Sequence, residues 1–194
     1  MGKLKKFIHL IKKNTFCKIN KEGDFTLGLK IIIYSFIFLS SSAIGMLISK
    51  KYEERVNELK EFKNALNMFK AKIKFTYEPI PEIFEQISEQ ITSKPGKIFK
   101  LASNNMKLLT AGDAWNMAID TDFLNINEED KNVLKNLSKL LGQTDIEGQI
   151  NQIELTSNFL DEQIEKAEKE KLKNEKMYRT LGMIIGLAIV IILM

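Results

Sequence analysis

Cysteine and histidine are almost absent from the 194-residue sequence, which contains only Cys17 and His9. One cysteine excludes a disulfide within the chain. A zinc site, a Cys–His pair or a Ser–His–Asp triad would have to draw its cysteine or histidine from these two residues. Both lie in a basic segment that has no apolar framework to position them. The sequence also lacks a Gly-rich phosphate-binding loop and the H-E-x-x-H and G-x-S-x-G motifs. We therefore predict no catalytic residue, no metal site and no cofactor, and we expect the protein not to be an enzyme.

Proline and glycine are scarce as well, with three prolines and ten glycines. Lys, Glu, Leu, Ile, Asn and Phe dominate instead, and this mixture favours helices over a β fold with many turns. The sequence predicts an all-α fold: a helical bundle of about six helices, with an N-terminal and a C-terminal membrane helix.

An excess of positive charge is found only at the start of the chain. The formal net charge is +4, and residues 1–30 hold eight lysines against Glu22 and Asp24, which gives 8 − 2 = +6. The remaining residues therefore sum to 4 − 6 = −2. Because the main body has no basic excess, its charge gives no support for binding nucleic acid. We interpret residues 1–30 as a basic N-terminal tail.

Residues 31–49 form the first charge-free apolar segment, IIIYSFIFLSSSAIGMLIS. As a helix this segment extends about 28 Å, close to the roughly 30 Å hydrocarbon core of a bilayer. A cleaved signal peptide is the alternative, with Ser41-Ser42-Ala43 as its small-residue cleavage site. The apolar run continues past Ala43, which favours a retained transmembrane helix.

Residues 177–194 form the second predicted transmembrane helix. Leu181–Met194 carries no charge and is apolar on every side, whereas a surface helix keeps a polar face. A buried core helix is the alternative for so short a stretch. Gly182 and Gly186 have the G-x-x-x-G spacing that lets another helix approach closely, and this spacing is compatible with self-association.

Residues 50–176 are predicted to form a soluble helical domain. Apolar residues from Tyr52 to Tyr77 recur at gaps of three and four, which indicates an amphipathic helix. Pro79 and Pro81 are expected to end this helix, and Pro81 also suits the start of the next one. A loop at residues 93–96 is expected to precede a helix over residues 98–109.

The second half of this domain contains several helix start signals. Thr110 and Asn127 are predicted to cap the starts of two helices. Gly142 is expected to end the helix that begins at Asn127. Residues 144–147 have the spacing of a capping box. From there the apolar pattern runs without a breaker into the final segment, so we expect one long stalk helix. Trp115 is predicted to be a core or interface anchor, a role for which Pro79 and Pro81 are also candidates.

Three blocks of the sequence match the order and spacing of motifs in a known family. They are residues 44–88 with their Pro-x-Pro hinge, TAGDAWNMAI at residues 110–119, and residues 140–193. On these blocks the chain resembles the stage III sporulation protein AB family over residues 28–194. Residues 1–26 extend beyond the usual start of the family pattern.

The resemblance implies a role that composition and spacing do not reveal. It implies that the protein is a non-enzymatic structural component of the membrane. The implied complex is a sporulation-specific secretion-like or channel complex between mother cell and forespore, and it is required for endospore formation. The implied partners are other stage III sporulation proteins, with a secretion-type ATPase among them, and the lipid bilayer. The implied fold is similar to the cytoplasmic domains of type II secretion F proteins, and the implied location is the mother-cell membrane.

The flanking charges give opposite indications of membrane topology, because the basic tail favours a cytoplasmic N-terminus and the basic flanks of the helical domain favour a cytoplasmic domain. If both segments span, the tail and the C-terminus share one side and the helical domain takes the other. The basic flanks on the domain side outweigh the single tail, so we expect a cytoplasmic domain. A membrane-tethered helical regulator or signalling scaffold is the alternative function.

Overall fold

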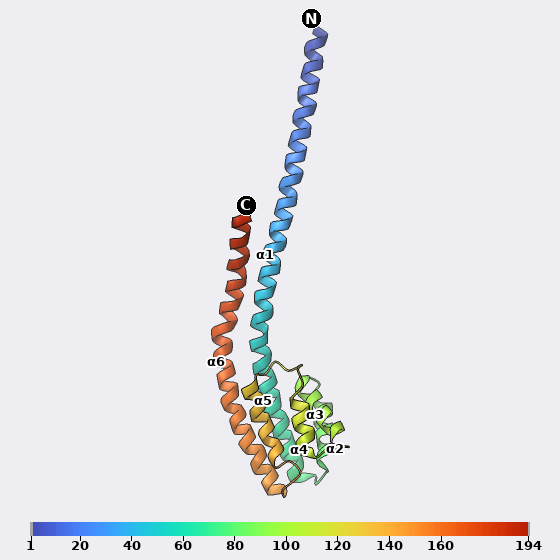
Figure 1. Ribbon diagram of the computed structural model, residues 1–194, viewed down its shortest axis with the longest axis vertical. Coiled ribbons are helices and arrows are strands. Elements are labelled where there is room, and N and C mark those ends of the chain that lie inside the picture. Colours follow the sequence, from blue (N-terminus) through green and yellow to red (C-terminus); the bar gives the residue numbers. More distant parts are fainter. Residues whose placement is uncertain (1, 194) are drawn as a thin grey trace. The chain divides into compact units, whose positions relative to one another are not determined.

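The computed structural model describes the backbone of residues 2–193 and the side chains of residues 28, 29 and 31–193 (Figure 1). Most of the predicted basic tail therefore lies outside the residues whose side chains are described. The helices are α1 (Gly2–Phe75), α2 (Ile80–Gln90), α3 (Lys94–Asn105), α4 (Ala111–Ile119), α5 (Glu128–Lys135), the 3₁₀ helix η1 (Asn136–Lys139) and α6 (Ile146–Leu193). These described residues contain six α-helices and no strand, so the predicted all-α fold with a long apolar helix near each end is confirmed.

Two compact units divide the chain. One comprises residues 1–47 and 178–194, and its described part is called here the apolar helix pair. The other, Ile48–Met177, is called the helical domain. The long helices α1 and α6 each contribute one segment to both units.

The core of the helical domain is formed by the apolar face of α1 packed against the shorter helices and α6. From α1, Leu59, Phe62, Leu66 and Phe69 are completely buried, at the gaps of three and four that the sequence shows. An aromatic cluster continues the core from α1 through α2 and α3 to α4. The ring centroids are 4.9 Å apart for Phe69–Phe84, 4.8 Å for Phe84–Phe99 and 5.1 Å for Phe99–Trp115.

Capping side chains set the start of α4 and α5 as predicted. The Thr110 hydroxyl accepts the amide hydrogen of Asp113 at 3.2 Å. At α5, Asn127 and Asp130 form a reciprocal capping box, with each side chain accepting the other's amide hydrogen. These bonds satisfy amide donors that have no partner within the helix.

Several predicted boundaries are wrong, including the end of the helix predicted over residues 98–109, which lies at Asn105 in α3. Residues 94–96 are helical rather than a loop, because Pro95 fits the first turn of α3, where no amide donor is needed. The helix from Asn127 leaves α-geometry at Lys135 and continues as η1 before Gly142, which has a φ of +74°. The cap of α6 is Asp145 rather than Thr144, because the Asp145 carboxylate accepts the Gly148 amide hydrogen at 2.9 Å.

Candidate functional site

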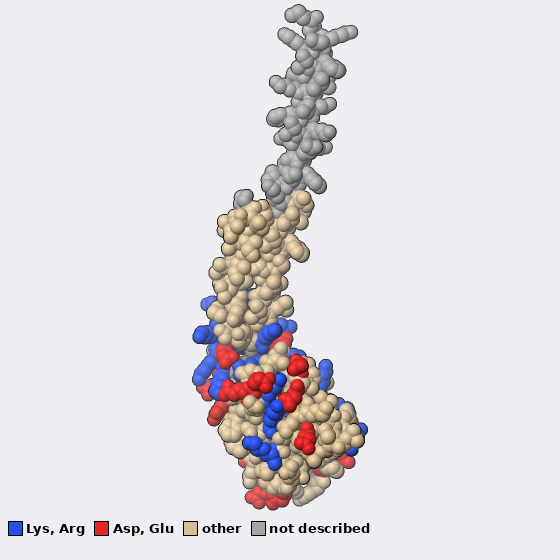
Figure 2. Space-filling view, viewed as in Figure 1, with Lys and Arg blue, Asp and Glu red and all other residues tan. Residues whose placement is uncertain are grey.

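The apolar helix pair exposes hydrophobic side chains over most of its surface. Ile32, Phe36 and Leu39 on α1 and Ile184, Ile185 and Ile192 on α6 are all at least half exposed. Figure 2 shows no charged side chain on the visible face of residues 31–47 and 180–193. Soluble proteins rarely expose so continuous an apolar surface. Both α1 and α6 contain a window long and apolar enough to cross a membrane.

Small residues bring the two helices of this pair together. A Cβ atom added to Gly45 would lie 2.7 Å from the Tyr178 carbonyl oxygen, and one added to Gly182 would lie 2.9 Å from the Ser41 carbonyl oxygen. At Gly186 an added Cβ would lie 3.1 Å from the Ser41 Cβ atom. Gly182 and Gly186 therefore pack against α1 of the same chain, with Gly45 as a contact that the spacing analysis missed.

Two side-chain hydrogen bonds reinforce this packing. The Ser41 hydroxyl donates to the Gly182 carbonyl at 2.8 Å. The Tyr34 hydroxyl donates to the Leu193 carbonyl, also at 2.8 Å, near the C-terminal end of α6, where carbonyl groups lack helix partners. Each bond spares a polar group from being left unpaired in an apolar environment.

In the helical domain a buried ion cluster joins α1, α5 and α6. The Arg55 guanidinium donates two hydrogen bonds to Asp130, from Nε at 2.7 Å and from Nη2 at 3.0 Å, and a third to Glu170 at 2.6 Å. The Asp130 side chain is completely buried and that of Arg55 is 8% exposed. Asp130 therefore serves both as a member of the capping box of α5 and as the counter-ion of Arg55 on α1.

The electrostatic balance around Arg55 favours its charged form. Burial by itself lowers the pKa of the guanidinium. The hydrogen bonds and negative charge of Asp130, together with the charges of Glu170 and Glu129, more than offset this effect, and the pKa is raised. Arg55 is thus a permanently charged, structurally paired residue rather than a titrating group.

A second polar cluster connects α1 to α3 and to the loop before α5. Lys94 donates to Glu58 at 2.9 Å, and the Asn125 backbone amide donates to the other Glu58 oxygen at 2.7 Å. The hydrogen bond to Glu58 raises the pKa of Lys94, and this effect exceeds the lowering of the pKa by burial. This cluster and the Arg55 cluster lie on α1 only three residues apart.

Ion pairs also cross from α1 to α6 along the length of the domain. They are Lys60–Glu168, Lys63–Asp161, Lys70–Glu154 and, with the signs reversed, Glu53–Lys171. Because these side chains are largely solvated, each pair contributes little stability. Together they connect α1 to α6 at four levels of the helical domain.

The candidate anchor residues have different environments. Trp115 is completely buried, and its indole Nε1 donates to the Leu134 carbonyl at 2.8 Å. Pro79 is the exposed N-cap of α2, and Pro81 lies half-buried in its first turn. Trp115 therefore has the environment of a core residue, while the two prolines shape the exposed connection between α1 and α2.

Replacing Trp115 by phenylalanine tests the indole hydrogen bond. The ring contacts remain largely possible, but the buried Leu134 carbonyl loses its donor, so we expect a loss of about 1–3 kcal/mol in the free energy of unfolding. Thermal unfolding followed by circular dichroism measures it. Met117→Leu is the matched control on the exposed face of α4, where Met117 is 60% exposed and a loss below about 0.5 kcal/mol is expected. Equal losses in the two variants would contradict a role for the indole bond.

The side chains described contain no group of three or more His, Cys, Asp or Glu residues arranged to hold a metal ion. The charged clusters are instead explained by contacts between helices. Sequence reasoning missed the pairing of Arg55 with Asp130 and the backbone conformation of Tyr77, because neither has a local sequence pattern.

Comparison with known proteins agrees with this architecture. The model of the family described as stage III sporulation protein AB matches residues 30–194. Stage III sporulation protein AB of Bacillus subtilis (strain 168) is 28% identical over 170 residues, which cover 86% of this chain and 99% of that protein. A solved structure of a stage III sporulation protein AB is similar in fold, with a TM-score of 0.58 and 23% identity over 62% of this chain and 98% of that chain. Because the family match covers both apolar helical segments and the whole helical domain, the chain belongs to the stage III sporulation protein AB family.

Proposed function

We propose that this protein is an integral membrane structural component of a sporulation-specific, secretion-like complex between mother cell and forespore, and that it is required for endospore formation. The observation that carries the proposal is the family match over residues 30–194, which includes the helical domain and both apolar segments. The polar clusters of the described side chains join helices to one another, as the Arg55–Asp130 pair joins α1 to α5, and this is compatible with a structural role.

Membrane insertion is supported by the apolar helix pair. Its outward-facing aliphatic side chains would contact lipid, while Ser41, Gly45, Gly182 and Gly186 face the partner helix. This is the arrangement favoured in bilayers, where close backbone packing and hydrogen bonds replace the hydrophobic effect as the force between helices. Thr180–Leu193 is about 21 Å long as a helix, so Arg179 would need to extend its guanidinium to the interface.

We place the helical domain in the cytoplasm of the mother cell. The residues that join it to the apolar segments are basic: Lys50 and Lys51 on α1, and Lys173, Lys176 and Arg179 on α6. Short cytoplasmic flanks of membrane helices carry such an excess of Lys and Arg. The partners would then be other stage III sporulation proteins, including a secretion-type ATPase that acts from the cytoplasm.

Deletion of the gene is the first test. We expect sporulating cells to complete engulfment and then to stall with a shrinking forespore, as seen by fluorescence microscopy of labelled membranes. The full-length gene should restore heat-resistant spores, whereas a gene truncated before Met177 should not, because its product lacks the second apolar helix.

Two other results would change the proposal. Normal spores in the deletion strain would contradict it outright. A stall with altered forespore gene expression, but with the other complex proteins still co-purifying, would favour a membrane-tethered regulator instead.

A further inference from the structure

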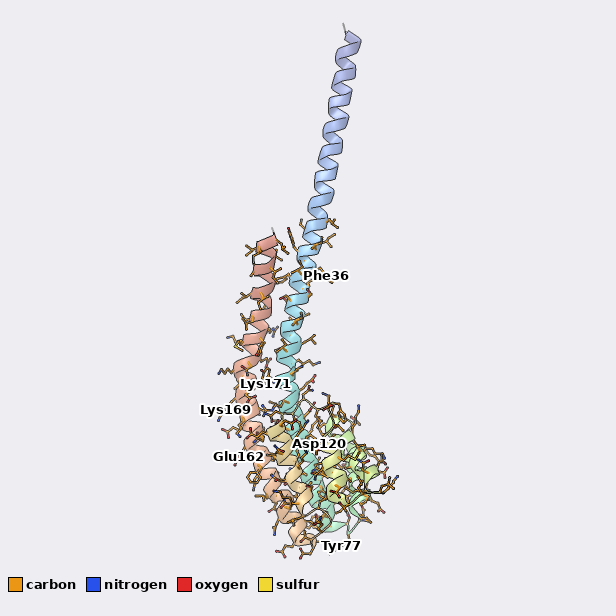
Figure 3. All side chains as sticks on the ribbon, in the orientation of Figure 1. Phe36, Tyr77, Asp120, Glu162, Lys169 and Lys171 are labelled. Atoms are coloured by element: carbon orange, nitrogen blue, oxygen red, sulfur yellow. The ribbon has the colours of Figure 1, made fainter. Side chains whose placement is uncertain are left out.

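One end of the helical domain combines exposed aromatic, aliphatic and acidic side chains. This end, here called the tip, consists of Phe75 at the end of α1, Tyr77 and Glu78 after α1, and Asp145, Ile146 and Glu147 at the start of α6. Tyr77 is labelled at this end of the domain in Figure 3. Within the domain, α1 rises about 1.5 Å per residue from Ile48 to Phe75, roughly 40 Å in all. The tip is therefore the end of the domain opposite to the residues that lead into the apolar segments.

The aromatic side chains of the tip are unusually open to solvent. Phe75 is 72% exposed and Tyr77 is 79% exposed. Tyr77 is also the only described non-glycine residue with a positive φ, at +55°. Bulky residues rarely adopt this left-handed conformation, and such residues concentrate at binding and switch sites. Tyr77 lies in the short connection between Phe75, the last residue of α1, and Pro79, the N-cap of α2.

An apolar groove of about 220 Å³ lies beside this ring. Its walls include Ile73 from α1, Tyr77 and Glu78 from the connection to α2, Ile80 from α2 and Ile146 from α6. The helical domain thus presents a hollow for an aliphatic side chain next to an aromatic surface. Buried aromatic and aliphatic anchors of this kind supply most of the energy at protein interfaces.

The acidic side chains of the tip lack basic partners. None of the fourteen ion pairs among the described residues includes Glu78, Asp145 or Glu147. Glu78 accepts a hydrogen bond from Gln86, and Asp145 caps α6, but neither contact cancels the charge. Elsewhere on the domain most acids pair with Lys or Arg. Figure 2 shows red side chains gathered at this end.

We propose that the tip binds a segment of a partner protein that presents Lys or Arg side chains next to aliphatic ones. An aliphatic side chain fills the groove against Ile80 and Ile146, and the partner's cations lie between Glu78 and Glu147 and over the Tyr77 ring. Complementary charge selects such a segment over an acidic one and speeds its encounter, and a cation over an aromatic face adds attraction. This proposal deepens the proposed function by assigning a chemical class to one partner contact.

Peptide binding to the full chain tests this assignment. The protein is placed in nanodiscs of zwitterionic lipid, with empty nanodiscs as the blank. Two fluorescent peptides share one pattern of leucines, and the other positions carry lysine in one and glutamate in the other. We expect the lysine peptide to bind and the glutamate peptide not to bind, as measured by fluorescence anisotropy.

Two variants localise the binding, and a third is the control. Tyr77→Asn removes the ring but keeps a residue that tolerates positive φ, and Glu78→Lys with Glu147→Lys reverses the charge. Each is expected to weaken binding of the lysine peptide roughly tenfold or more, as for interface anchors. Glu162→Lys, an exposed change on α6 away from the tip, is the matched control and should leave binding unchanged. Fluorescence of the buried Trp115 verifies that each variant is folded.

Several results would overturn the proposal. Equal binding of both peptides would show a purely apolar groove, and unchanged binding in the tip variants would place the contact elsewhere. Self-association of the chain that is lost in Tyr77→Asn would assign the tip to a second copy instead.

A chromosomal test separates this inference from the proposed function. If deletion stalls sporulation while the Glu78→Lys and Glu147→Lys variant sporulates normally, the tip assignment falls and the proposed function stands. If deletion has no effect, the proposed function falls, and the peptide measurement still decides the chemistry of the tip.

Discussion

Replacing Asp130 by alanine is expected to lower the free energy of unfolding of the helical domain by about 3–5 kcal/mol. The change leaves the Arg55 guanidinium buried without the carboxylate that accepts two of its hydrogen bonds. It also removes the acceptor for the Asn127 amide at the start of α5. Urea unfolding of the full chain in detergent, followed by Trp115 fluorescence, reports on this domain because Trp115 is the only tryptophan and lies in its core.

A matched control and a double variant define the cause. Glu128 lies in the same first turn of α5, but its side chain is 79% exposed in an ion pair with Lys131. Glu128→Ala should therefore change the free energy of unfolding by less than about 1 kcal/mol. Adding Arg55→Met to Asp130→Ala should recover part of the loss, because the buried charge that has lost its Asp130 partner is then absent. A loss for Asp130→Ala no larger than that for Glu128→Ala would contradict the buried ion cluster.

Helices and core could be predicted because their signals are local. The gaps of three and four from Val56 to Ile73 mark the buried face of α1, and the caps at Thr110 and Asn127 are the ones observed. Boundaries were wrong where two signals compete within a few residues, as at Pro95, which starts a helix instead of preceding it. The sequence alone does not rank such signals, since packing decides between them.

The ion clusters and the tip could not be predicted, because their defining contacts are distant in sequence. Arg55 appears from the sequence to be one of several basic residues flanking the first apolar segment, yet it is buried against Asp130, 75 positions away. Gly45 acquires a role only when Gly182 is placed opposite it. The positive φ of Tyr77 has no residue signal at all, because glycine or asparagine would be expected there. These contacts arise from tertiary packing that a single sequence does not encode locally.

Close packing of the apolar helix pair depends on residues without side-chain bulk, so Gly182→Leu is expected to separate its two helices. The Cβ of any substituent at Gly182 would meet the Ser41 carbonyl oxygen and the Gly45 Cα atom at 2.9 and 3.0 Å. Both contacts are with backbone, which cannot yield without displacing the helix. Overpacking of this kind costs about 1–3 kcal/mol, which corresponds to a decrease of roughly fivefold to a hundredfold in the ratio of the paired to the separated state.

Disulfide formation measures this pairing. The native cysteine is first removed by Cys17→Ser, and new cysteines are introduced by Ser41→Cys and Gly186→Cys. A Cβ atom built at Gly186 lies 3.1 Å from the Ser41 Cβ atom, which is near the separation that a disulfide requires. Oxidation in membranes should produce a crosslinked monomer with altered mobility on a non-reducing gel, and adding Gly182→Leu should reduce its yield roughly tenfold. Adding Gly28→Leu instead is the control, because nothing lies within 4 Å of a Cβ at that position. Crosslinked dimers in place of monomers would show that these glycines mediate self-association, and an unchanged yield with Gly182→Leu would contradict pairing through Gly182.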